Sequence, residues 1–329
     1  MTTTVAWVIG ARGLLGTAVT AEIASRAGWR LLPSDPLPWS EPELLDGAAT
    51  DTTTRLLAAV DEQSAEDDTA ATWAIVWVGG AAVTSTPERL LDEELAQLET
   101  VLAAIESRLG RGPARGAVFY ASSAGGVYGG SSSPPFTEST EPSPISPYGE
   151  FKLRAEDAIT RFGARTGVST LIGRIANLYG PGQKLEKMQG LISQLARAQY
   201  SSAPASIFVS LDTTRDYLYV TDAAALVCDA LDELHRRSQA SSDGVQVTKI
   251  IASGSAATIG ELLGHFHALV KGHPHIMLGQ SASASLQAID LRLRSTVWPH
   301  LDRRDLTPLP VGIHATMSSV LAELTAAAS

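Results

Sequence analysis

The chain alternates short, fully apolar runs with longer stretches in which apolar residues recur every three or four positions. After the run "VAWVIG", the stretch "LLGTAVTAEIASRAG" places Leu15, Ala18, Val19 and Ile23 at helical spacing. Further apolar runs are "WRLLPSD", "WAIVWVG", "GAVFYASS" and "VSTLIGRIANLYG". Strands that are apolar throughout and separated by amphipathic helices are typical of a parallel sheet covered on both faces. The pattern therefore predicts an α/β fold built on a doubly wound parallel sheet.

Two polar segments interrupt this alternation. Residues 36–72 are rich in Asp, Thr and Ala and contain the acidic cluster "DEQSAEDD", which favours a solvated face or a surface loop. Residues 129–147 read "GGSSSPPFTESTEPSPISP", a composition that in isolation is typical of a linker. Because this second segment lies between a predicted strand and a predicted helix, we interpret it as a loop over a functional site.

The length of the chain predicts more than one structural unit. It has 329 residues, of which 44% are hydrophobic, and is longer than a usual single domain. Beyond residue 176 the predicted elements become less regular, and no internal repeat is present. We predict a first domain over residues 1–176 and a smaller α/β domain over residues 177–329, interleaved with the first.

Charge and composition exclude several classes of function. The formal net charge is −10 and no dense Lys/Arg run is present, so nucleic acid is not an expected partner. No apolar stretch is long enough to cross a bilayer, and the N-terminus has no basic segment before its apolar run. Cys228 is the only cysteine, so no internal disulfide can form. We expect a soluble, cytoplasmic protein.

A glycine-rich turn, "GARGLLG", follows the first predicted strand and opens the first predicted helix. Its glycines, Gly10, Gly13 and Gly16, have the spacing G-x-x-G-x-x-G. Such a turn allows close approach of the backbone to a pyrophosphate, which lies at the positive N-terminus of the helix. The context predicts a dinucleotide site of the Rossmann type. The predicted cofactor-binding residues in this turn and after the third strand are Gly10, Arg12, Gly13, Leu14, Gly16, Gly79 and Gly80.

The sequence leaves the choice of dinucleotide open. Asp35 follows the second strand, where a carboxylate accepts hydrogen bonds from the adenosine ribose and repels a 2′-phosphate, which favours NAD. Arg12, with Ser34 nearby, is suited to bind that phosphate and favours NADP. We expect NAD or NADP, with a slight preference for NAD.

Tyr148 and Lys152 form the second chemical signal, in the stretch "PYGEFK". Pro147 suits the first position of a helix, with Ser146 as its cap. Residues four apart point to the same side of a helix. A tyrosine has an ordinary pKa of about 10, and a neighbouring lysine cation favours its phenolate. The pair is therefore suited to proton transfer beside a positively charged nicotinamide.

Taken together, these motifs resemble the extended short-chain dehydrogenase/reductase family, which includes nucleotide-sugar epimerases, dehydratases and ketoreductases. The resemblance covers nearly the whole chain and rests on "GARGLLG", "SSAGGVYG", "YGEFK", "RIANLYGPGQ" and "RDYLYVTDAA". It implies that Tyr148 is the catalytic acid/base, that Lys152 binds the nicotinamide ribose, and that Ser123 hydrogen-bonds the reacting oxygen. One additional residue before "VYG" leaves Ser122 as an alternative.

The resemblance also assigns a substrate. Asn177 and Arg215 match positions that contact the phosphates in nucleotide-sugar enzymes, although Asn177 could instead cap a turn and Arg215 could pair with Asp216. The implied chemistry is hydride transfer between a carbinol carbon of the sugar and the nicotinamide. Residues 1–176 would bind the dinucleotide and residues 177–329 the substrate. The helices over residues 86–109 and 147–164 would pack against a second subunit in a homodimer.

Three activities remain open within this resemblance. A nucleotide-sugar 4-epimerase is favoured, and the alternatives are an NADPH-dependent ketoreductase of a keto sugar or other carbonyl compound and a non-catalytic dinucleotide-binding sensor. The stretch "MLGQSASASLQAID" has no basic residue where many relatives carry an arginine, which keeps the ketoreductase open. Dehydration is not expected, because Ala124 and Gly125 occupy the positions of the acidic pair. His265, His267, His273 and His275 lack the spacing of a metal site, so no metal is predicted.

Overall fold

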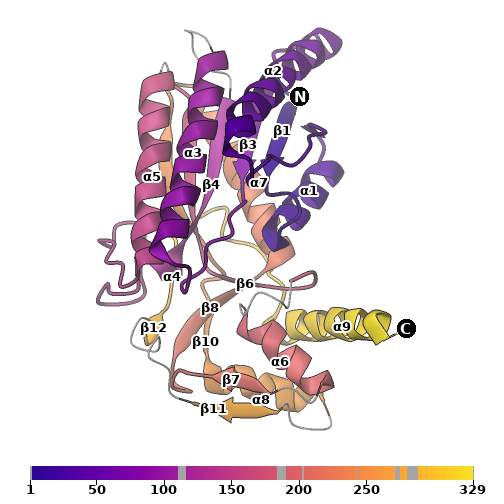
Figure 1. Ribbon diagram of the computed structural model, residues 1–329, viewed down its shortest axis with the longest axis vertical. Coiled ribbons are helices and arrows are strands. Elements are labelled where there is room, and N and C mark those ends of the chain that lie inside the picture. Colours follow the sequence, from indigo (N-terminus) through magenta and orange to yellow (C-terminus); the bar gives the residue numbers. More distant parts are fainter. Residues whose placement is uncertain are drawn as a thin grey trace.

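A parallel sheet forms the centre of the larger part of the molecule in this computed structural model (Figure 1). The structure describes residues 2–109, 116–183, 190–201, 204–241, 243–270, 275–279 and 288–328. The sheet has six strands in the order β2-β1-β3-β4-β5-β9, and every pair is parallel. Its strands are β1 (Thr4–Ile9), β2 (Trp29–Leu31), β3 (Thr72–Trp77), β4 (Gly116–Ser123), β5 (Ser169–Ile175) and β9 (Gln246–Ile251).

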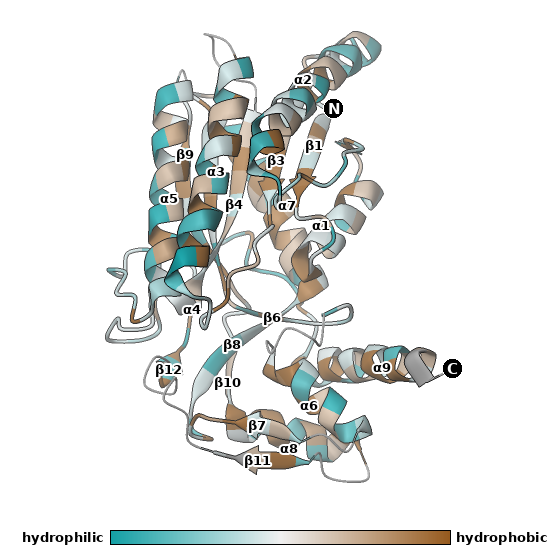
Figure 2. Cartoon of the chain, in the orientation of Figure 1, coloured by the Kyte–Doolittle hydropathy of each residue, from teal (hydrophilic) through white to brown (hydrophobic). Residues whose placement is uncertain are grey.

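Helices cover both faces of this sheet, which confirms the predicted doubly wound fold. One face packs against α2 (Pro42–Asp67), α3 (Glu88–Leu109) and α5 (Pro147–Thr166), and the other against α1 (Leu14–Ser25) and α7 (Val220–Ser238). Successive side chains of a strand point to opposite faces, so the two cores share strands but no residues. Figure 2 shows the apolar strands between helices whose hydrophilic residues face outward.

The strand order reverses between β1 and β3, and the loops after these two strands touch. A Cβ atom added to Gly10 would lie 2.3 Å from the Cα atom of Gly79. Gly10 therefore requires glycine, and a Cβ on Gly79 would itself lie only 3.2 Å from the Gly10 Cα atom. In doubly wound sheets, ligands bind in the crevice at the carboxyl ends of the strands where the order reverses. The fold thus opens a binding crevice at the glycine turn.

The smaller part of the molecule is built from residues that follow β5. Its strands and helices pack around a third core, separate from the two cores of the large sheet. β8 (Thr214–Tyr219) lies between its neighbours, antiparallel to one and parallel to two. The other elements are β6 (Asn177–Tyr179), α6 (Leu191–Tyr200), β7 (Ala205–Ile207), β10 (Ala256–Thr258), α8 (Ile259–Leu269), β11 (Ile276–Leu278), β12 (Asp290–Leu291) and α9 (Leu309–Ala328).

The proposed division at residues 176 and 177 lies between β5 and β6. After this point the chain returns to the large sheet, because α7 packs against α1 and β9 pairs with β5. It then passes back to the smaller part through β10 and α8. The chain therefore crosses between the two parts more than once, which limits their independent movement.

The prediction of a surface loop within residues 36–72 was wrong, because this region forms the long helix α2. Leu45, Ala49, Leu56 and Val60 of this helix are buried against the sheet. Its threonines and Gly47 weaken the helical signal in the sequence, and tertiary packing overrides that weakness. The acidic cluster does lie on a solvated surface, since Asp61, Glu62 and residues 66–68 are exposed.

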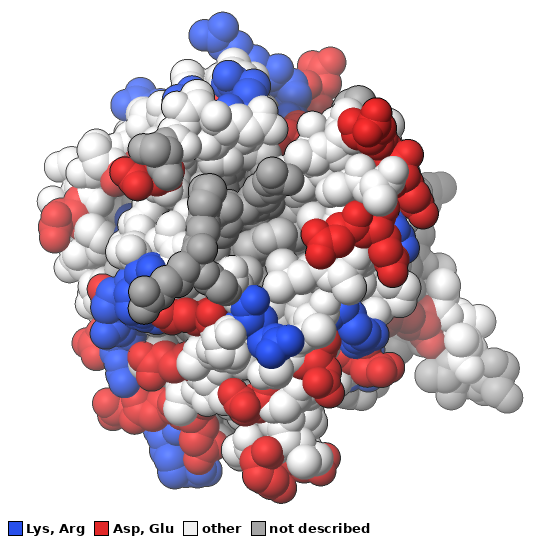
Figure 3. Space-filling view, turned by 90° about the horizontal axis from the view of Figure 1, so that it is seen from above, with Lys and Arg blue, Asp and Glu red and all other residues white. Residues whose placement is uncertain are grey.

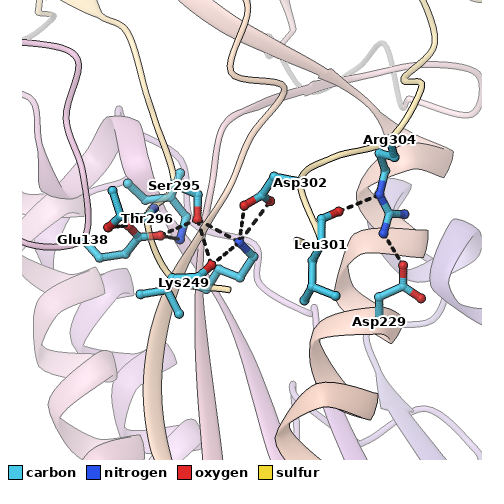
Figure 4. A network of polar contacts seen from close by, with 10 residues as sticks. Glu138, Asp229, Lys249, Ser295, Thr296, Leu301, Asp302 and Arg304 are labelled. Carbon is cyan, nitrogen blue, oxygen red and sulfur yellow. Dashed lines mark hydrogen bonds and ion pairs between the residues drawn. The ribbon is translucent and has the colours of Figure 1, made fainter. Parts of the chain in front are cut away.

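The second polar segment, residues 129–147, connects the short helix α4 (Ala124–Val127) to α5 and is held by a backbone bridge from Phe136 to Leu293 and by the carboxylate of Glu138. Glu138 accepts hydrogen bonds from the backbone N–H of Ile250 at 2.9 Å and from the hydroxyl of Ser295 at 2.7 Å. The fully buried ammonium group of Lys249 donates to Ser295 and lies 2.8 Å from Asp302 (Figure 4). This network fastens the segment to β9 and to the chain before α9.

The described surface agrees with the composition. On the face seen in Figure 3, acidic and basic side chains are interspersed and no extended basic area is visible. None of the helices in the described ranges combines the length and apolar character needed to cross a bilayer. Cys228 is buried on α7, and burial raises the pKa of its thiol to about 12, so this thiol is poorly reactive.

Candidate active site

A single cleft of about 1450 Å³ runs from the glycine turn across the ends of β3 and β4 to the smaller sheet. Its size exceeds that of a pocket for one small ligand, which is roughly 300–1,000 Å³. It is lined by every predicted site residue except Gly16, namely Gly10, Arg12, Gly13, Leu14, Asp35, Gly79, Gly80, Ser123, Tyr148, Lys152, Asn177 and Arg215. The fold therefore brings the predicted cofactor, catalytic and substrate residues together.

The glycine turn has the shape that a dinucleotide pyrophosphate requires. Gly13 caps the N-terminus of α1, and its backbone N–H donates to the Gly10 carbonyl at 2.9 Å. Gly16 is buried under the turn, where an added Cβ would lie 2.0 Å from the Gly10 oxygen. No side chain fills the N-terminus of α1, since Gly13 makes no side-chain cap. These residues fit an NAD-type cofactor, whose phosphates would face the helix N-terminus.

Residues after β2 line the predicted cofactor-binding end of the cleft. Asp35 and Arg12 are both exposed in the cleft wall, with Ser34 partly buried beside them. Trp39 and Trp77 pack with ring centroids 5.9 Å apart and line the same end. Because neither charged side chain is in an ion pair within the described residues, both are free to contact a ribose or its phosphate.

Tyr148 and Lys152 lie on the first two turns of α5, as the helical spacing predicts. The hydroxyl of Ser146 caps this helix by accepting the Gly149 N–H at 3.2 Å. Lys152 is buried, and its ammonium group lies 5.8 Å from the centre of the Tyr148 ring. It donates to the Tyr120 hydroxyl and to the Ala121 carbonyl, both at 3.2 Å. Two of its three N–H groups are thus fixed by β4, and the third is available to the cleft.

The surroundings of Lys152 keep it charged. Burial alone would lower its pKa, but the interactions with Tyr120, Tyr148 and Glu94 outweigh burial and raise the pKa above its usual value. Lys152 is therefore a cation at neutral pH. Burial raises the pKa of Tyr120, so this second phenol stays neutral and serves as a hydrogen-bond partner.

The two serines at the end of β4 have different partners. Ser122 is buried and donates to Glu156 at 2.5 Å. Ser123 is partly exposed in the cleft, and its oxygen accepts the Gly126 N–H at 3.1 Å as the cap of α4. The hydroxyl hydrogen of Ser123 is therefore available to a ligand, while that of Ser122 is not. This geometry favours Ser123 over Ser122 for the catalytic role.

Glu156 belongs to a buried polar network behind the catalytic face of α5. It pairs with Arg174 of β5, whose guanidinium also donates to the Tyr128 hydroxyl at 2.7 Å. All these side chains are buried. Breaking a buried ion pair by removing one partner typically costs about 3–5 kcal/mol. The network therefore fixes β4, β5 and α5 relative to one another, one turn beyond Lys152.

Asn177 and Arg215 lie on neighbouring strands of the smaller sheet, β6 and β8. Arg215 is buried and donates to the Thr214 carbonyl at 2.9 Å. It does not pair with Asp216, which instead accepts hydrogen bonds from Ser253 and Gly254. No ion pair to Arg215 occurs among the described residues. Residues 280–287, which belong to the stretch "MLGQSASASLQAID", lie outside the described residues. Asn177 is exposed to the cleft.

Comparison with known proteins identifies the family. A sequence model of the NAD dependent epimerase/dehydratase family matches residues 6–241. The chain belongs to this family. Its members are NAD-dependent enzymes, in agreement with the predicted cofactor and with the resemblance of the motifs.

Individual relatives in this family are distant. The chain is 32% identical over 119 residues to dTDP-4-dehydro-6-deoxyglucose reductase of Escherichia coli and 34% identical over 107 residues to a putative UDP-glucose 4-epimerase of Methanocaldococcus jannaschii. These alignments cover 36% and 32% of this chain and only 37% and 35% of the relatives. The solved UDP-glucose 4-epimerase of Thermus thermophilus with NAD is 18% identical, with a TM-score of 0.73 over 97% of this chain and 99% of that chain. This last similarity shows the shared fold.

Within the family fold, two cleft residues, Gln97 and Glu94, and the buried Tyr120 behind the cleft were not predicted from the sequence. Tyr120 holds Lys152, Gln97 donates to the Trp39 carbonyl at 2.9 Å, and Glu94 accepts hydrogen bonds from the loop after β3. Helical spacing is the signal that could have identified Glu94, because it shares a face of α3 with the buried Leu91 and Leu98, whereas Asp92 and Glu93 are exposed.

The sequence predicts no metal site, and the structure does not test this prediction over the whole chain. In the ranges that the structure describes, no group of three or more His, Cys, Asp or Glu side chains is arranged to bind a metal ion. His273 lies outside those ranges, so this expectation stays a prediction.

Proposed function

We propose that this chain is an NAD(P)-dependent enzyme that acts on a sugar hydroxyl or keto group, and specifically a nucleotide-sugar 4-epimerase. The observation that carries the proposal is the continuous cleft, which extends from the glycine turn past Tyr148 to Arg215. A dinucleotide at one end and a phosphate-bearing substrate at the other would meet at Tyr148. The family membership and the named epimerases among the relatives support the same activity.

The catalytic residues have separate roles in this proposal. Bound NAD would supply a reversible hydride acceptor for a carbinol carbon of the sugar. Tyr148 takes the proton of the reacting hydroxyl and later returns it. Lys152, held as a cation by its surroundings, places its positive charge 5.8 Å from the centre of the Tyr148 ring and would bind a ribose hydroxyl. Ser123 donates its free hydroxyl hydrogen to the reacting oxygen.

The smaller sheet would bind the substrate. Arg215 is buried and forms no ion pair among the described side chains, and the nearby Asp290 also pairs with Arg292, so a phosphate is a suitable counter-charge. Burial lowers the pKa of Arg215, which shows that the cost of burying this cation is incompletely offset by its neighbours. Asn177 would donate to the same phosphates from β6. A nucleotide sugar satisfies both residues.

For the cofactor, we propose NAD in preference to NADP. Asp35 is exposed at the end of the cleft where the adenosine ribose would lie, and its carboxylate would repel a 2′-phosphate. Arg12 faces the same end and is the residue that would permit NADP. The preference therefore depends on which of these two charges contacts the ribose.

A ketoreductase is the second candidate, and the match to a reductase of Escherichia coli favours it. Such an enzyme would use the same Tyr148 and Lys152 but would exchange its cofactor in every turnover. Retention of both residues argues against a non-catalytic sensor. Dehydration lacks its acid and base, because Ala124 and Gly125 occupy the corresponding positions.

The test begins with the cofactor. Purified protein is denatured, and the released nucleotide is identified by chromatography and mass spectrometry; tightly held NAD is the expected result. The protein is then incubated with UDP- and dTDP-hexoses, and formation of the C4 epimer is followed by NMR. Tyr148→Phe should lower the turnover number at least about 100-fold, in the range for loss of a general acid/base.

Tyr200→Phe is the matched control, because Tyr200 is a half-exposed tyrosine of α6 outside the cleft and its replacement should leave turnover unchanged. Consumption of NADPH with a keto sugar, without epimerisation, would replace the epimerase by the ketoreductase. Recovery of no cofactor, together with no binding on titration, would refute both.

A further inference from the structure

Glu94 is an acidic residue of α3 that forms part of the cleft wall, and the reaction described above does not use it. Its side chain is half-buried. The Oε2 atom accepts hydrogen bonds from the backbone N–H groups of Ala81 and Ala82, each at 3.0 Å. These two residues follow Gly79 and Gly80 in the loop after β3. One carboxylate oxygen therefore holds this loop in place against the cleft.

The other oxygen of Glu94 is directed differently. A Cβ atom added to Gly80 would lie 2.8 Å from Oε1, so this oxygen lies against the glycine backbone. Among the described residues, no hydrogen-bond donor to Oε1 is found. The negative charge is close enough to Lys152 and Tyr120 to affect the pKa of each. Oε1 thus places an uncompensated acceptor and a negative charge near the predicted nicotinamide end of the cleft.

We infer that Glu94 is a cofactor-positioning residue that favours the oxidised, cationic nicotinamide over the reduced, neutral one. Its Oε2 atom fixes the loop after Gly80, and its charge offsets the cation of Lys152. This inference rests on the proposed function only in placing the nicotinamide beside Lys152.

The electrostatic reason follows from the charges around the ring. Lys152 alone would oppose a cationic nicotinamide and favour the reduced form, because like charges in a partly desolvated site repel. The negative charge of the Glu94 carboxylate, which also lines the cleft, reduces this bias. An epimerase must hold its cofactor in both redox states during one turnover, so a balance between the two charges suits the proposed activity.

Glu94→Gln separates the two roles of the residue. The amide oxygen of glutamine can still accept both N–H groups of the loop, while the negative charge is lost. After removal of any bound cofactor, the dissociation constants of the oxidised and reduced dinucleotides are measured by calorimetry. We expect the constant for the oxidised form to rise about tenfold, relative to the constant for the reduced form, as for the loss of one favourable charge interaction.

Three further variants control this result. Glu94→Asp keeps the charge and should keep the wild-type ratio of the two constants, even if both constants rise because the loop is held less firmly. Glu94→Ala should raise both constants and also the ratio. Glu93→Gln removes an exposed charge of the same helix, one that pairs with Arg89 outside the cleft, and should leave the ratio unchanged.

An unchanged ratio in Glu94→Gln, with wild-type circular dichroism, would overturn the inference and leave the proposed function intact. A ratio that changes equally in Glu93→Gln would overturn it as well, because the effect would then come from net charge. A wild-type chain that binds neither redox form would refute the proposed function together with the inference.

Discussion

At the scale of single residues, some polar groups of the site are used in structural hydrogen bonds, and their neighbours remain available to a ligand. Ser122 and Ser123 are chemically identical, but the first donates to a buried carboxylate and the second caps α4 with its oxygen while keeping its hydrogen free. The same division is found at Lys152, where two N–H groups are fixed by β4 and one remains. Catalytic capacity at this site therefore follows from which donors are left unused.

The serines provide a direct test of this division. Ser123→Ala should lower the turnover number about 100-fold, which is typical for loss of one hydrogen bond to a reacting oxygen, and should cost about 0.5–2 kcal/mol in the free energy of unfolding for the lost cap of α4. Ser122→Ala should leave the turnover number near the wild-type value, while it removes one partner of buried Glu156 at a cost of about 1–3 kcal/mol in the free energy of unfolding. Steady-state kinetics and thermal unfolding of both variants measure these effects. A larger loss of turnover in Ser122→Ala would assign the catalytic role to that residue.

Whether a site residue could be predicted from the sequence depends on whether local or distant contacts position it. Tyr148 and Lys152 were placed correctly relative to each other because a helix of known start determines which side chains share a face. Ser123 was predicted from the motif with Ser122 as the alternative, and the different contacts of the two serines on opposite faces of β4 could not be read from the sequence. Tyr120 was not found, because its partner Lys152 lies on a later helix. Glu94 was not found, because its partners are backbone N–H groups of a loop, which leave no pattern of side chains in the sequence.

At the scale of elements, polar contacts join the two parts of the molecule, beside the apolar packing of Leu218 of β8 in a core of the large sheet. Asp216 of β8 accepts hydrogen bonds from the backbone N–H groups of Ser253 and Gly254, both at 2.8 Å, and from the Ser253 hydroxyl. These acceptor bonds tie the smaller sheet to the turn between β9 and β10.

Buried strands were predicted from their apolar runs, whereas α2 was missed because its apolar positions are separated by threonines and acidic residues.

Asp216 should make stability depend on pH. Burial raises its pKa from 3.8 to about 6, although its hydrogen bonds partly oppose this. The folded chain therefore binds this proton more tightly than the unfolded chain, so the stabilising contribution is present below about pH 4 and is lost as the pH rises through 6. At ~1.4 kcal/mol per pH unit, the expected loss between pH 4 and 7 is about 3 kcal/mol.

Asp216→Asn isolates this contribution, since it removes the titration. Its free energy of unfolding is subtracted from that of the wild type at each pH, which cancels the other titrating groups. The wild-type value should fall relative to the variant as the pH rises from 4 to 7, as measured by urea unfolding. A difference that stays constant over this range would contradict the assignment of the raised pKa.

At the scale of the whole molecule, one cleft connects the proposed cofactor site to the proposed substrate site at the start of α5. The large sheet supplies the glycine turn, the smaller sheet supplies Asn177 and Arg215, and α5 stands between them with Tyr148. The parallel sheet was predicted because its strands carry a strong local signal. The return of α7 and β9 to that sheet could not be predicted in this way. It depends on contacts between segments about 75 or more residues apart, and sequence patterns describe only neighbouring residues.

The predicted homodimer is the remaining question at this scale, and α3 and α5 are its proposed interface. These helices lie side by side (Figure 1), and their outward faces are joined by ion pairs such as Arg154 with Asp92 and Arg165 with Glu106. Ala96 is exposed on the same face of α3 as Asp92, one helical turn away. A small residue there would allow a second subunit to approach closely, and exposed ion pairs cost little to rearrange.

Sedimentation velocity of the wild type should show twice the mass of a single chain. Ala96→Arg should convert it to the monomer, because a long charged side chain would be forced into the interface. Ala24→Arg is the control, since Ala24 is an exposed alanine of α1 on the opposite side of the sheet and its replacement should leave the dimer intact. A monomeric wild type would show that the ion-paired surface of α3 and α5 is simply solvated, and a dimer that survives Ala96→Arg would place the interface on other helices.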